Sequence, residues 1–104
     1  MKLMVWDHKK RDWIEIFEGT MQQVALITVW MNHSYKFRWH QRYVDGGITR
    51  IMMSEEASVE DLAKIIKDPE AMLREVESDT EMHPRLKKDV VALIERYMRG
   101  RERW

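Results

Sequence analysis

The chain of 104 residues is long enough for one folded domain but too short for two ordinary ones, so we expect a single domain over residues 1–104. It has no cysteine, which excludes disulfides, thiolate catalysis and zinc bound by cysteine. Its 18 basic and 18 acidic residues cancel, and no apolar run is long enough to span a bilayer or to serve as a signal peptide. We therefore expect a cytoplasmic protein without a membrane partner.

The N-terminal part, residues 1–53, is predicted to form an antiparallel β-meander of about five strands. The expected strands are 2–6, 12–18, 23–31, 35–43 and 48–53. Segment 23–31 is apolar on both faces, as expected of a central strand, and Asn32-His33 would form a tight turn because asparagine tolerates a positive φ. A two-residue turn there would place Trp30 beside Tyr35 on one apolar face.

Residues 34–44 alternate aromatic and basic side chains almost strictly. As one strand, the segment would send its aromatic rings to one face and its cations to the other. The aromatic residues are Tyr35, Phe37, Trp39 and Tyr43, and the cations are Lys36, Arg38, His40 and Arg42. In a purely structural interpretation the rings are core and the cations are surface, whereas in a functional one the cations bind an anion. A β-bulge near Gln41 would change which side chains share a face.

Residues 54–104 are predicted to form two or three α-helices that pack on the sheet, which makes the fold class α+β. Ser58 and Asp61 have the spacing of a capping box, with aspartate in place of the usual glutamate. Asp68-Pro69 is typical of a second helix start, with proline in the first turn. The longest helix is expected to begin at His83-Pro84.

Charge is distributed unevenly along the chain. Residues 1–53 carry a net charge of +3, residues 54–83 of −7 and residues 84–104 of +4. The segment 96–104 holds four arginines and a terminal tryptophan, which is more than a helix C-terminus needs to complement its dipole. Such blocks are typical of separate charged faces, or of parts that attract each other or a second copy, so a homodimer is also considered.

Motifs for catalysis or cofactor binding are absent. The sequence has no HExxH, P-loop, GxGxxG or GxSxG motif, and no two of its four histidines have the helical spacing of a metal pair. A DNA-binding helix-turn-helix is excluded, because its second helix would carry several acidic side chains that phosphates repel. We therefore expect no cofactor, no metal site and no enzymatic activity. Acid–base cleavage of RNA stays open as an alternative, with His8, His33, His40 and Lys36 as its candidate residues.

The preferred hypothesis is a small non-enzymatic binding module for an anionic ligand, either nucleic acid or a nucleotide-like phosphate. The candidate ligand-binding residues are Lys36, Arg38, His40, Arg42, Arg50, Arg99, Arg101 and Trp104. The alternative is a protein-interaction or inhibitor protein, of the kind that phages and mobile elements encode, that covers a partner's surface. Five tryptophans and nine methionines suit that alternative, because both residue types are common at interfaces.

Overall fold

A computed structural model describes the backbone of residues 1–101 and the side chains of residues 1–96. In chain order the elements are β1 (Lys2–Asp7), β2 (Asp12–Glu18), α1 (Met21–His33), β3 (Trp39–Asp45), β4 (Ile48–Met53), α2 (Val59–Ile66), α3 (Pro69–Ser78) and α4 (Pro84–Arg101). The predicted α+β class is confirmed. Within residues 1–101 it consists of four strands and four helices, not the five strands and two or three helices expected.

The sheet is mixed, so the prediction of an antiparallel meander is wrong. Strands β1 and β2 form one antiparallel hairpin, and β3 and β4 form another. The two hairpins join through a parallel pairing of β1 with β4, which gives the strand order β2-β1-β4-β3. The central strands are therefore β1 and β4, and β2 and β3 are the edges.

Segment 23–31, predicted as a central strand, lies instead in helix α1. The helix begins with a capping box: Thr20 Oγ1 accepts a hydrogen bond from Gln23 N at 3.1 Å, and Gln23 Oε1 accepts one from Thr20 N at 2.7 Å. The chain must pass from β2 at one edge of the sheet to β3 at the other, and α1 crosses the sheet's face as it does so. Asn32-His33 is consequently the last turn of this helix, and the predicted hairpin turn and its register are wrong.

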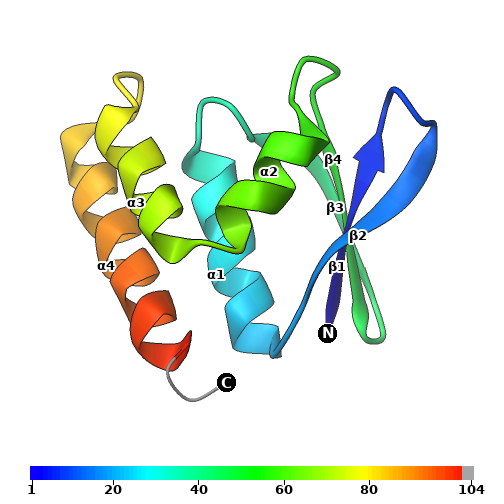
Figure 1. The fold of residues 1–104 in the computed structure, drawn as a ribbon, viewed down its shortest axis with the longest axis horizontal. Helices are drawn as coiled ribbons and strands as arrows, with labels where there is room; N and C mark the ends of the chain where they lie inside the picture. The colour runs from blue at the N-terminus through cyan, green and yellow to red at the C-terminus, as the bar shows by residue number, and fades with distance from the viewer. Residues whose placement is uncertain (102–104) are drawn as a thin grey trace.

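All four helices lie on one side of the sheet, as Figure 1 shows. Helix α4 packs against α1 and α3, on the side of the helical layer that is farther from the sheet. The hydrophobic core lies between the sheet and the helices and includes Leu3, Val5, Ile51, Ile27 and Trp30. The opposite face of the sheet carries no helix from the described residues. None of the helices in residues 1–101 has the length and apolar character needed to cross a membrane.

Gly19 joins β2 to α1 at a place where a larger residue does not fit. A Cβ atom there would overlap Gln23 Oε1 and the Phe17 ring. Because Gln23 Oε1 accepts the Thr20 N–H in the capping box, we expect Gly19→Ala to displace that side chain and lower the free energy of unfolding by about 1–2 kcal/mol. Urea unfolding followed by circular dichroism measures the change.

The matched control for this prediction is Gly47→Ala. A Cβ atom at Gly47 would have no heavy atom within 4 Å. The control should therefore change the free energy of unfolding by less than about 0.5 kcal/mol. Equal losses in both variants would contradict the explanation through the capping box.

Candidate functional site

The aromatic–basic segment is not one continuous strand. Residues 35–37 form a turn, and β3 begins only at Trp39. The aromatic rings were expected to share one face of the strand. Phe37 is buried, however, whereas the Tyr35 side chain is 69% exposed, so these two rings do not share a face. The prediction of a strand over 35–43 is therefore wrong in its first half.

A β-bulge at His40 changes the faces in the second half. Trp39 pairs with Met53 and Gln41 pairs with Met52, so His40 is the extra residue. Beyond the bulge, Arg42 lies on the same face as Trp39, and its guanidinium carbon is 5.7 Å from the centroid of the Trp39 ring. The bulge thus brings together a cation and an aromatic ring that strict alternation would have separated.

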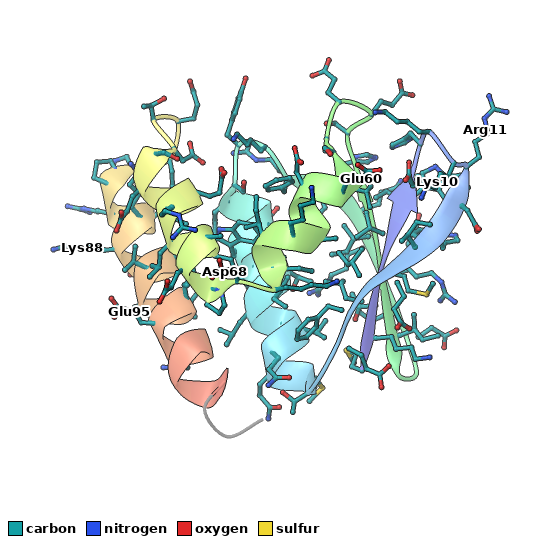
Figure 2. All side chains as sticks on the ribbon, viewed as in Figure 1. Lys10, Arg11, Glu60, Asp68, Lys88 and Glu95 are labelled. Atoms are coloured by element: carbon teal, nitrogen blue, oxygen red, sulfur yellow. The ribbon has the colours of Figure 1, made fainter. Side chains whose placement is uncertain are left out.

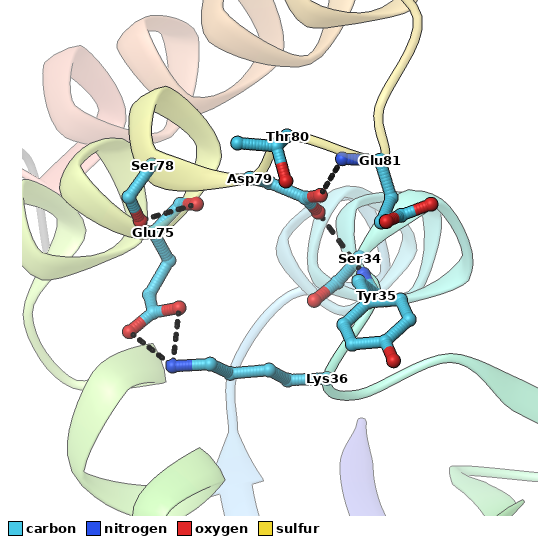
Figure 3. A pocket seen from close by; sticks show the side chains of 8 residues that line it. All are labelled: Ser34, Tyr35, Lys36, Glu75, Ser78, Asp79, Thr80 and Glu81. Carbon is cyan, nitrogen blue, oxygen red and sulfur yellow. Dashed lines mark hydrogen bonds and ion pairs between the residues drawn. The ribbon is translucent and has the colours of Figure 1, made fainter.

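Lys36 is engaged within the protein. Its Nζ lies 3.3 Å from a carboxylate oxygen of Glu75 in α3 (Figure 3). Beside this ion pair, the Asp79 carboxylate accepts hydrogen bonds from Tyr35 N at 3.1 Å and from Glu81 N at 2.9 Å. These contacts hold the α1–β3 loop against the end of α3. We therefore assign Lys36 a structural role in the loop and leave it out of the candidate site.

Arg38, His40 and Arg42 differ from Lys36, since all three are exposed, with Arg38 directly before β3 and the other two within it. The ion pairs among the described side chains are Lys2–Glu15, Lys36–Glu75 and Arg74–Asp68. No described carboxylate is within ion-pair distance of any of these three side chains. We call them the β3 cation row, which consists of the two arginines Arg38 and Arg42 and the basic side chain of His40 between them.

Arg50 lies on the other face of the sheet, away from the helices. It is the register partner of Tyr43 in β3 and of Met4 in β1. The same face holds Trp6 and Trp13, whose ring centroids are 5.3 Å apart in an edge-to-face arrangement. We call this helix-free side of the sheet the open face. Sequence reasoning missed it, because residues 3–6 are all apolar and the sequence does not show which side of the strand the helices cover.

The remaining candidates come from the C-terminal segment. Arg99 and Arg101 lie in α4, but their side chains are outside the described part of the structure. Trp104 is outside the described residues altogether. Of the sequence-predicted set, Arg38, His40 and Arg42 therefore lie exposed at or directly before β3, whereas Lys36 is ion-paired with Glu75 and Arg50 lies on the open face.

A shallow groove borders the β3 cation row on the helix side. It has a volume of about 170 Å³ and lies between α1 and the edge of the sheet. Its lining residues are Met1, Met21, Val24, Ala25, Thr28, Arg42, Val44 and Thr49. Sequence reasoning missed this groove because it placed residues 23–31 in a strand. The spacing of Met21, Ala25 and Val29, four residues apart, was the helical signal for the exposed side of α1.

The four histidines lie in separate parts of the fold. His8 is in the β1–β2 turn, His33 ends α1, His40 forms the bulge of β3 and His83 precedes α4. Within the described residues, no group of three or more histidine, aspartate or glutamate side chains could hold a metal ion.

Comparison of the chain with protein-family models, with curated proteins and with solved structures finds no match.

Proposed function

We propose that this protein is a non-enzymatic binding module that holds an anionic ligand at the edge of its sheet through Arg38, His40 and Arg42. The observation that carries the proposal is the exposure of these three basic side chains, two of them arginines, without a described carboxylate in ion-pair distance. Charged groups on a protein surface that are not neutralised locally attract ligands of opposite charge. Lys36 and Arg50 are not part of this site, since one is ion-paired and the other lies on the open face.

The Arg42 guanidinium is held in position before a ligand arrives. It lies over the Trp39 ring, and the Trp39 side chain is itself fixed because its Nε1–H donates a hydrogen bond to the carbonyl oxygen of Thr28 at 2.8 Å. A planar guanidinium can donate two parallel hydrogen bonds to a carboxylate or a phosphate. A cation–π contact with tryptophan at this distance favours some Arg42 rotamers over others, which lowers the entropy lost when an anion binds.

Fluorescence anisotropy tests the proposal with two labelled polyanions, a single-stranded oligonucleotide and an oligoglutamate peptide, each at two salt concentrations. We expect the native protein to bind at least one of them at low salt and to bind it more weakly at high salt. The double variant Arg38→Glu/Arg42→Glu should lower the affinity by at least about tenfold without changing the circular dichroism spectrum.

The matched control reverses two charges far from the site. Arg85→Glu/Lys88→Glu changes the net charge by the same amount, but these exposed residues lie on α4, and Figure 2 shows Lys88 at the side of the molecule opposite the sheet. This variant should retain most of the affinity. Equal losses in the two double variants, or no binding of either polyanion at low salt, would overturn the proposed function.

A protein-interaction surface is the second candidate function, and the open face favours it. Trp6 and Trp13 lie edge to face there, next to Met4 and beside polar side chains such as Glu15 and Arg50. A solvated sheet face usually carries polar side chains, so two large apolar rings there are unusual. Tryptophan and methionine are enriched at protein interfaces. Binding through this face should be lost in Trp6→Ala and should depend little on salt, whereas binding through the β3 cation row should show the opposite pattern.

A further inference from the structure

The groove between α1 and β3 is lined mainly by apolar side chains, with Thr28 and Thr49 among them. Arg42 carries the one charged side chain among the described residues that line it. Two lining residues are strongly exposed for apolar side chains, with Met21 at 64% and Val44 at 57%. Apolar residues exposed in a concave surface and bordered by a cation are typical of a binding site for a ligand that is itself partly apolar and partly anionic.

The outer edge of β3 offers backbone hydrogen-bonding groups beside this groove. Strand β3 pairs with β4 alone, and no described residue pairs with its other edge. Asp45 and Ile48 are partners across the two-residue turn formed by Gly46 and Gly47, so they close the ladder as a hydrogen-bonded pair. The alternation of an antiparallel ladder then directs the N–H and C=O groups of Arg42 and Val44 outward, away from β4.

The side chains of the same two residues face the groove. Arg42 and Val44 pair with Ile51 and Thr49, whose side chains are buried under the helices, and both residues line the groove next to α1. Arg42 and Val44 therefore both direct backbone N–H and C=O groups outward from the edge of the sheet. Their side chains add a guanidinium and an apolar contact in the groove beside that edge. A β-strand from another polypeptide matches this arrangement, because its side chains alternate with the same period.

We propose that the groove binds an extended, acidic segment of a partner polypeptide, which adds to the edge of β3 as a further strand. This inference rests on the proposed anion binding and identifies the anion as a carboxylate side chain. A carboxylate of the partner would lie against Arg42, and an apolar side chain two residues away would occupy the groove beside Val44. The recognised pattern is thus acidic-x-apolar for a parallel strand and apolar-x-acidic for an antiparallel one.

A second copy of this chain suits the edge less well. Pairing β3 with itself would bring the Arg38, His40 and Arg42 side chains of two copies into one ribbon, with Asp45 as the acidic residue of the strand in each. Like charges on facing strands destabilise the pairing. Charge complementarity therefore favours an acidic partner strand over self-association.

Nucleic acid also suits the groove less well. A phosphodiester backbone cannot continue a β-ladder, and the apolar lining formed by Met21, Val24 and Val44 offers nothing to a phosphate. The Trp39 ring is half-buried, is fixed by its bond to Thr28 and lies under Arg42, so its faces are not free to stack on a base.

The test uses a fluorescein-labelled decapeptide that repeats Val-Thr-Glu-Thr and so contains both orders of the recognised pattern. Its anisotropy is titrated with the native protein, with Arg42→Glu and with Arg50→Glu. Arg50 is the matched control, because it lies in β4 on the open face and its reversal makes the same charge change. We expect Arg42→Glu to weaken binding by at least about tenfold and Arg50→Glu to leave it within about threefold of the native value.

N-methylated forms of the peptide test whether the backbone takes part. One form carries N-methyl groups on its valine and glutamate amides and the other on its threonine amides. Alternate amides of an added strand point toward β3, so one form should lose at least about tenfold in affinity and the other should bind nearly as well as the parent. Loss on methylation of valine and glutamate would indicate an antiparallel strand, and loss on methylation of threonine a parallel one.

The outcomes separate this inference from the proposed function. If both N-methylated forms bind like the parent, charge alone holds the peptide and strand addition is wrong. If a single-stranded oligonucleotide binds through Arg42 and the peptide does not, the anion site stands but the partner is not a polypeptide. If neither binds at low salt, both proposals fail, and the cations and the His40 bulge serve to protect the edge from aggregation.

Discussion

Trp30→Ala is expected to lower the free energy of unfolding by about 3–5 kcal/mol, because it removes a large ring from a close-packed interior. The Trp30 side chain is 1% exposed, and its ring centroid lies 5.8 Å from that of Phe37. The residue therefore ties α1 to the loop that leads into β3. Urea unfolding followed by circular dichroism and tryptophan fluorescence measures the loss.

The neighbouring variant Val29→Ala is the control for this prediction. Val29 lies on the exposed side of α1, and 39% of its side chain is exposed. Alanine has the higher helix propensity, so the substitution should change the free energy of unfolding by less than about 0.5 kcal/mol. A large loss in Val29→Ala together with a small loss in Trp30→Ala would mean that the two sides of this segment had been assigned the wrong way round.

Ala25→Pro is expected to destabilise the protein by about 3 kcal/mol or more, because proline inside a helix removes one hydrogen bond and clashes with the carbonyl group four residues earlier. That carbonyl belongs to Met21, the first residue of α1. Ala25 is exposed, so little packing is lost with the alanine side chain itself. Thermal unfolding followed by far-UV circular dichroism measures the effect.

Two further variants keep this prediction testable if Ala25→Pro does not fold. Ala25→Gly should cost about 1 kcal/mol and Ala25→Ser less, in the order of their helix propensities. Alanine should be the most stable of these four residues at position 25 if the position lies within a helix, whereas alanine is itself disfavoured in a strand. Wild-type stability in Ala25→Pro would contradict the assignment of α1.

The elements that the sequence predicted correctly are those with a local signal. In β1, buried Leu3 and Val5 alternate with less buried neighbours, as the predicted strand requires. Helix α2 begins where Ser58 Oγ accepts a hydrogen bond from Asp61 N at 3.2 Å, and α3 begins where Asp68 Oδ1 accepts one from Glu70 N at 3.1 Å. Strand alternation and helix caps depend on residues within a few positions of each other, so a single sequence carries them.

Helix α1 also has a local signal at its start, which the strand prediction did not use. Thr20 and Gln23 have the spacing of a capping box, and they form it. The nine residues 23–31 are nearly all apolar, however, and a short apolar run fits a buried strand as well as a buried helix. The topology explains why this segment is a helix. It connects β2 at one edge of the sheet to β3 at the other, and such a crossover connection is usually an α-helix that packs on the face of the sheet.

The candidate site was predicted only in part. The sequence pointed to Arg38, His40 and Arg42, which the fold leaves exposed at one edge of the sheet. It could not show that the His40 bulge would place Arg42 over Trp39, because a bulge is set by the register with β4. The groove beside Arg42 is also lined by residues of α1, and most of that helix was predicted from the sequence as a strand.

The sequence by itself determined the α+β class, three of the strands and the starts of the last three helices. Only the tertiary structure decided the parallel pairing of β1 with β4, the open face and the division of the cations into free and paired ones. The physical reason is distance along the chain: Lys36 is neutralised by Glu75, which lies 39 positions away. Such contacts follow from how the hairpins and helices pack as bodies, and no local pattern of side chains encodes them.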